Sequence, residues 1–201
     1  LQTGQNIRQS IDCLQRAFAE ASVVIITFGT AWVYEQDGVV VANCHKIPAD
    51  RFTRRRLTVN EIVSAWQPII SANPDKHFIF TVSPIRHIKD GLHENQLSKA
   101  TLLLAIAQLA DNQSVSIDYF PSYEILLDEL RDYRFYADDM LHPSSVAVNY
   151  IWERFVSAYM SAATQQEMHP LHQLYLDRHH TLLHPDSPAS RIFLSRLEQN
   201  L

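Results

Sequence analysis

The chain has 201 residues, a formal net charge of −5 and 46% hydrophobic residues, which fit one globular domain with a sizeable core. The negative charge leaves no basic surface for nucleic acid, and no apolar run reaches membrane-spanning length. The two cysteines do not make a disulfide framework, and the polar first residues are no signal peptide, which favours a cytoplasmic location.

The first part of the chain predicts a helix, a strand and a hairpin. Residues 5–20 carry apolar side chains at helical spacing, and residues 22–28 form a short β-branched run typical of a strand buried on both faces. Asp37-Gly38 favours a tight turn between the apolar runs 32–34 and 39–41. Opening with a helix before such a strand is unusual for a complete α/β domain.

The next segment contains four arginines between residues 51 and 56. They indicate a solvated face or contacts with acidic groups, with an anionic-ligand role as the alternative. Thr58 and Glu61 then predict a capping box at the start of a helix, in which Ile69 or Ile70 faces inward.

The second half of the chain alternates strands and helices. Residues 77–82 predict a second buried strand, and residues 114–120 predict a third. Helices are expected over about 96–111, after Pro121, and from Ser144 or Ser145 onward, the last packed through Val148 and its helical neighbours.

The last residues differ in composition from the rest, because they are polar and rich in histidine. We expect a domain over residues 1–164 and a helical extension over 165–201. The extension contains five histidines, among them His169 and His172, but Pro170 should interrupt a helical face there. No cysteine or carboxylate cluster accompanies them, so we predict neither a metal site nor a cofactor.

Alternation of this kind predicts an α/β fold with a mainly parallel sheet and helices on both faces. Strand ends of one polarity gather at one edge of such a sheet, where ligands bind. Polar groups follow the strands at that edge, so they are expected to line one cleft: Gly29 with Thr30, Arg86 with His87, His93 and Asn95, and Asp139 with His142.

Asp139 and His142 are the expected catalytic pair. A carboxylate that accepts a hydrogen bond from Nδ1 of the imidazole leaves Nε2 free to take a proton from a nucleophile. A surface ion pair or a helix cap is the alternative reading of the same two residues. Ser83, at a strand end, is better explained as a turn hydroxyl than by chemistry, and Ser98, at a helix start, is explained as well by a cap as by chemistry.

Five stretches together resemble the GSCFA-domain family, which belongs with the GDSL/SGNH hydrolases. In chain order they are residues 26–34, 41–46, 80–91, 95–100 and 136–144. The resemblance implies a flavodoxin-like three-layer α/β/α fold of the SGNH-hydrolase type. It also implies that Asp139 orients His142, which acts as general base.

The resemblance implies further site residues. Gly29 and Thr30 fall where the superfamily has a Gly-x-Asn-Asp block, whose Asn helps to form the oxyanion hole, but this chain has Ala31 at the Asn position. A backbone N–H near Gly29 or the side chain of Asn43 is the expected substitute, with His45 in the same cleft. The expected substrate-binding residues are Arg86, His87, Asn95, Ser98 and Lys99.

The Gly-Ser-Cys-Phe-Ala segment that names the family does not occur in these 201 residues. We therefore expect the first strand and the nucleophilic serine to lie upstream, and this chain alone to be inactive. The expected activity is hydrolysis of small-molecule or carbohydrate esters, such as O-acyl groups. The alternative is a non-catalytic carbohydrate- or protein-binding module. A missing strand would expose a sheet edge, and an exposed edge invites association into a homo-oligomer.

Overall fold

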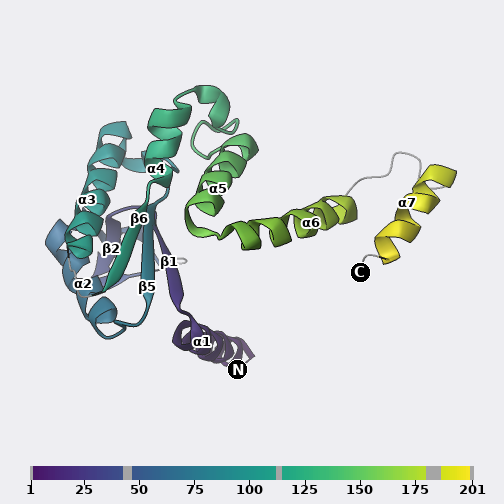
Figure 1. The fold of residues 1–201 in the computed structure, drawn as a ribbon. Helices are drawn as coiled ribbons and strands as arrows, with labels where there is room; N and C mark the ends of the chain where they lie inside the picture. Colours follow the sequence, from purple (N-terminus) through teal and green to yellow (C-terminus); the bar gives the residue numbers. More distant parts are fainter. Residues whose placement is uncertain (1, 43–46, 112–114, 180–186, 200–201) are drawn as a thin grey trace. The chain divides into compact units, whose positions relative to one another are not determined.

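The computed structural model describes residues 2–42, 47–111, 115–179 and 187–199 (Figure 1). The chain divides into two compact units, Leu1–Ile151 and Trp152–Leu201. The first unit contains two sheets, and the described part of the second is helical. The expected domain boundary at residue 164 stays a prediction.

A parallel sheet forms the centre of the first unit. Its strands are β1 (Val23–Phe28), β5 (His77–Val82) and β6 (Ser116–Phe120), in the order β1-β5-β6. Helices α2 (Val59–Ser71) and α3 (Leu92–Ala110) lie side by side beside this sheet (Figure 1). The predicted α/β fold with a parallel sheet is confirmed.

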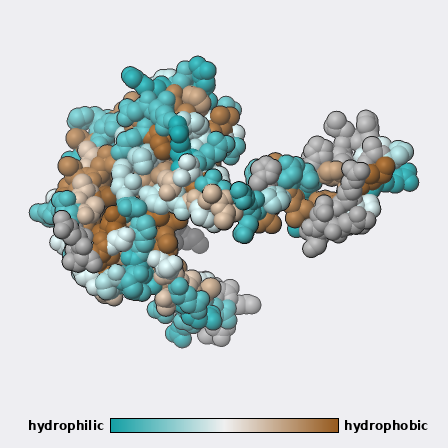
Figure 2. All heavy atoms as spheres, in the orientation of Figure 1, coloured by the Kyte–Doolittle hydropathy of each residue, from teal (hydrophilic) through white to brown (hydrophobic). Residues whose placement is uncertain are grey.

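The two faces of β1 have different surroundings. Ile26 and Phe28 pack against the core cluster that contains Ile70 of α2 and Ile106 of α3. Ile25 points to the opposite face because side chains alternate along a strand, and it is 55% exposed. Hydrophobic residues reach the surface over this part of the sheet (Figure 2). The prediction that β1 is buried on both faces is therefore wrong for the described residues.

A small antiparallel sheet follows β1. It consists of β2 (Trp32–Gln36), β3 (Val39–Val41) and β4 (Thr53–Arg56), in the order β3-β2-β4. The predicted hairpin is confirmed, and its turn has positive φ at both Asp37 and Gly38, as a type I′ turn requires. Strand β4 was not predicted, because an arginine run has no apolar alternation to mark a strand.

The arginines of β4 contact acidic side chains. Arg55 forms a bidentate pair with Glu61, at 2.6 and 3.0 Å, and also bonds to Glu35 at 2.9 Å. Arg54 pairs with Asp90, and Arg56 lies 3.4 Å from Glu94. Contacts with acidic groups, rather than an anionic ligand, therefore account for these three arginines.

The remaining elements are helical. They are α1 (Gln2–Glu20), η1 (Ala49–Arg51), η2 (Ile88–Asp90), α4 (Ser122–Glu124), the π-helix η3 (Ile125–Leu130), η4 (Tyr133–Phe135), α5 (Ser145–Tyr159), α6 (Ala162–His179) and α7 (Pro188–Gln199). Two details differ from expectation. Val148 and Trp152 of α5, both expected to pack inward, are 52% and 50% exposed, and α6 continues through Pro170.

Helix α2 begins with the predicted capping box. The Thr58 hydroxyl accepts from the Glu61 N–H at 3.2 Å, and the Glu61 carboxylate accepts from the Thr58 N–H at 2.8 Å. At the other end, Ile70 is fully buried while Ile69 is 43% exposed, so Ile70 is the residue that faces the core.

We predict that Ile70→Ala lowers the free energy of unfolding by about 2–5 kcal/mol, because it leaves a cavity in the core. Ile69→Ala, the matched control on the same helix, should cost less than about 1 kcal/mol. Urea denaturation of the two variants measures both values. Equal losses would mean that α2 does not present Ile70 to the sheet.

Candidate active site at the carboxyl end of the sheet

Lys99 joins the ends of two neighbouring strands. Its ammonium group donates to the carbonyl of Gly29, which follows β1, and to that of Ser83, which follows β5, both at 2.6 Å. The residue is 1% exposed, and burial lowers the pKa of its ammonium group to about 8. No described carboxylate forms an ion pair with this cation, so its hydrogen bonds go to the backbone.

Ser98 holds the segment after β1. Its hydroxyl accepts from the Ala31 N–H at 2.8 Å and lies 3.0 Å from the Thr30 hydroxyl. Ser98 is itself 1% exposed. The Ala31 N–H therefore already has a partner, and an oxyanion donor expected near Gly29 would have to come from another group.

Asn95 holds the segment after β5. Its amide oxygen accepts from the His87 N–H at 2.8 Å. The His87 ring lies beside Gly29, where a Cβ would stand 3.7 Å from Nε2. Burial lowers the pKa of His87, and the nearby charges of Lys99, His142 and Arg54 lower it further. His87 Nε2 is buried without a hydrogen-bond partner among the described residues.

Asp139 and His142 form the expected pair. The carboxylate Oδ2 lies 2.5 Å from Nδ1 of the imidazole, and Oδ1 accepts from the N–H groups of Leu141 and His142 at 2.9 and 3.0 Å. These three hydrogen bonds, led by the two from the backbone, lower the pKa of Asp139 to about 2. The carboxylate is thus ionised and fixed toward the ring. Both side chains are exposed, His142 at 57%.

Arg86 contacts the loop that carries Asp139 and His142. Its N–H donates to the Leu141 carbonyl at 3.2 Å, and its Nη1 donates to the Met140 carbonyl at 3.3 Å. Its guanidinium also lies 4.0 Å from the centre of the Tyr136 ring. The loop that carries Asp139 is therefore attached to the segment that follows β5.

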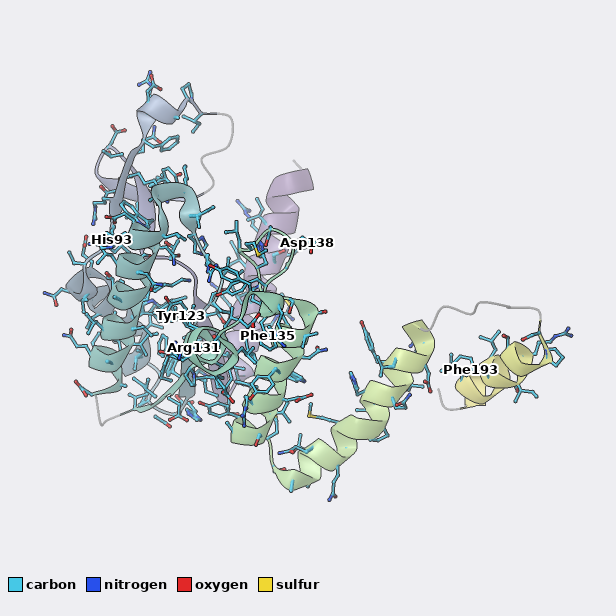
Figure 3. All side chains as sticks on the ribbon, turned by 90° about the horizontal axis from the view of Figure 1, so that it is seen from above. His93, Tyr123, Arg131, Phe135, Asp138 and Phe193 are labelled. Atoms are coloured by element: carbon cyan, nitrogen blue, oxygen red, sulfur yellow. The ribbon has the colours of Figure 1, made fainter. Side chains whose placement is uncertain are left out.

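The structure brings most of the predicted site residues together at one edge of the sheet. Those gathered are Gly29, Thr30, Arg86, His87, Asn95, Ser98, Lys99, Asp139 and His142. His93 is exposed on α3. It lies well apart from Asp138, which belongs to the same loop as Asp139 and His142 (Figure 3). Asn43 and His45 lie outside the described residues. The functional roles of all these residues stay predictions.

The serines at the strand ends are already engaged. Ser83 Oγ accepts from the Ile85 N–H at 3.3 Å, and Ser98 holds the segment after β1. No serine hydroxyl within the described ranges is hydrogen bonded to His142. The site as described contains an acid and a base but no nucleophile beside them.

Within the described residues, no group of three or more His, Cys, Asp or Glu side chains is placed to hold a metal ion. His180 and His184 of the extension lie outside those residues. No helix in the described part of the chain is both long and apolar enough to cross a membrane.

The sequence did not single out the aromatic residues around Arg86. The guanidinium lies over the rings of both Tyr136 and Tyr133, the second at 5.4 Å. The signal available was the sequence Tyr133-Arg134-Phe135-Tyr136, three aromatic residues directly before the Asp139 loop.

The buried ammonium of Lys99 makes stability depend on pH. Its pKa is about 8 in the folded chain against an ordinary 10.5, so the unfolded chain binds more protons between these values. The free energy of unfolding should therefore rise by up to about 3 kcal/mol as the pH increases through this window. Denaturation at several pH values measures the rise, which should be absent in Lys99→Met. The same rise in both proteins would contradict the assignment.

Comparison with known sequences identifies the family of this chain. The sequence model of the GSCFA family matches residues 2–155. Comparison with curated proteins finds no match, and comparison with solved structures finds none either. The family match spans more than half of the chain and includes the sheet, the Lys99 contacts and the Asp139–His142 pair. The chain therefore belongs to the GSCFA family.

Proposed function

We propose that this chain supplies the acid–base pair of a serine-type ester hydrolase that acts on small-molecule or carbohydrate esters. The observation that carries the proposal is the contact between Asp139 Oδ2 and His142 Nδ1 at 2.5 Å. An ionised carboxylate at this position favours the tautomer with its proton on Nδ1, which leaves Nε2 as the base.

The proposed reaction has two displacements. The expected upstream serine attacks the ester carbonyl, and His142 Nε2 takes the hydroxyl proton and returns it to the departing alcohol. Water then attacks the acyl-enzyme, with His142 again as the base. Asp139 stabilises the imidazolium formed in each step. Oxyanion donors are expected from the N–H of Gly29 or from Asn43, because the Ala31 N–H is bonded to Ser98.

We propose further that the fold is the three-layer α/β/α type of the SGNH hydrolases. The parallel order β1-β5-β6 and the pair α2 and α3 on one face support this assignment. The position of the polar residues also supports it, since open α/β sheets bind ligands at the carboxyl ends of their strands. An additional strand beside β1 would complete that sheet.

A non-catalytic binding module is the second candidate. It is favoured by the 57% exposure of His142 and by the lack of a serine bonded to it among the described residues. In such a module the same polar edge would bind a carbohydrate or a protein segment without turnover. The two candidates differ in whether the imidazole is needed for chemistry.

Hydrolysis of short p-nitrophenyl esters by the protein from its complete gene separates the two. We predict that His142→Ala lowers kcat/KM at least about 100-fold, because it removes the general base. His93→Ala is the matched control, since His93 is exposed on α3 and forms no hydrogen bond or ion pair with the described residues of the proposed site. It should leave the rate unchanged.

Two outcomes would contradict the proposal. Turnover that survives His142→Ala would remove His142 from the mechanism, and a complete protein without ester hydrolysis would favour the binding module. The 201-residue chain provides a further check, since it should show no turnover. Turnover by this chain that is lost when one of its own serines is replaced would place the nucleophile within it.

A further inference from the structure

Two adjoining pockets lie next to the Asp139 loop. The larger has a volume of about 220 Å³, and the smaller, of about 130 Å³, shares Arg86, Leu127 and Tyr133 with it. The larger pocket is also lined by Leu126 of the π-helix η3 and by Arg131, Asp132 and Tyr136. A cavity of about 150 Å³ suffices for a benzene ring, so the larger pocket has room for a small ligand.

The charges around the larger pocket are unbalanced. Arg86 and Arg131 both line it, and neither forms an ion pair with any described carboxylate. The acidic side chains nearby have other partners: Asp132 binds Arg134 at 3.0 Å, Glu124 binds the Tyr119 hydroxyl at 2.7 Å, and Glu129 binds the Tyr150 hydroxyl. The residues that line the pocket therefore include two guanidinium groups and one carboxylate, and that carboxylate is already paired with Arg134.

Tyr136 provides an independent indication of a ligand. Its side chain lines the pocket, the residue is 8% exposed, and its hydroxyl is buried with no hydrogen bond of ordinary geometry to the described residues, although it interacts with the Arg86 guanidinium beside it. An unpaired buried hydroxyl costs free energy, so such groups normally have a partner in the working protein. A π-helix also forms part of the wall, and π-helices occur frequently at functional sites.

We infer that this pocket binds a carboxylate group and that the natural ligand is therefore a carboxylate-bearing molecule. Guanidinium groups bind carboxylates through paired, charge-assisted hydrogen bonds, and the Tyr136 hydroxyl would donate a further one. The Tyr133 ring offers a flat apolar surface on the same wall. Figure 3 labels one residue from each pocket, Arg131 from the larger and Tyr123 from the smaller.

The pocket bears on the proposed function, on which the substrate part of this inference rests. Arg86 lines the pocket, and its backbone and guanidinium both bond to residues 140 and 141 beside His142. A ligand held by Arg86 is thus bound by a residue that also contacts the loop of the proposed base. The ester substrate would then carry a negative charge, as an acidic sugar or the half-ester of a dicarboxylic acid does.

Isothermal titration of the 201-residue chain with benzoate tests the inference. Benzamide has the same shape without the charge, and we expect it to bind at least about tenfold more weakly. Arg131→Gln and Arg86→Gln should each weaken benzoate binding at least about tenfold, and Tyr136→Phe should weaken it a few-fold. Arg51→Gln is the matched control, because Arg51 is exposed and lines neither pocket.

Three results would overturn the inference: no saturable binding of benzoate, equal binding of benzamide, or an equal loss in Arg51→Gln. The denaturation midpoint of each variant shows whether it is folded. Binding requires neither turnover nor His142, so His142→Ala should retain its benzoate affinity. Failure of the ester assay with benzoate binding intact would leave the carboxylate pocket in place and reject only the hydrolase. If benzoate does not bind while the ester assay succeeds, the carboxylate pocket is rejected and the hydrolase proposal stands.

Discussion

One face of α3 holds the carboxyl end of the sheet together. Lys99 binds the carbonyls that follow β1 and β5, Ser98 binds the segment around Ala31, and Asn95 binds the His87 N–H. All three side chains are almost fully buried. Polar groups in such a position must be satisfied within the protein, so this face fixes where the loops after both strands can run.

The proposed catalytic pair depends on that arrangement. The segment that Lys99 and Asn95 hold continues through Arg86, whose N–H binds the carbonyl of Leu141 in the loop of His142. Within this loop Asp139 accepts two backbone hydrogen bonds in addition to the imidazole contact. The loop thus keeps the carboxylate ionised and directed at Nδ1, although both side chains remain exposed to solvent. Arg86 also lines the proposed carboxylate pocket.

The sequence predicted the elements with clear periodicity and the residues with clear spacing. The buried strand β5, the Asp37-Gly38 hairpin and the Thr58 capping box follow from local signals that the structure retains. Strand β4 gave no such signal, because its arginines pair with carboxylates distant in sequence, namely Glu35, Asp90 and Glu94. Apolar composition predicted β1 to be buried, but burial depends on which elements cover each face. The pocket around Tyr136 arises from tertiary contacts of Arg86, which spacing does not encode.

The proposed role of Asp139 is to set the tautomer of His142, and the nitrogen chemical shifts of the imidazole ring measure that tautomer. We expect neutral His142 to carry its proton on Nδ1 with Nε2 unprotonated, and Asp139→Asn to remove this preference. A ring with its proton on Nε2, or a tautomer preference that Asp139→Asn leaves unchanged, would rule out this role for Asp139.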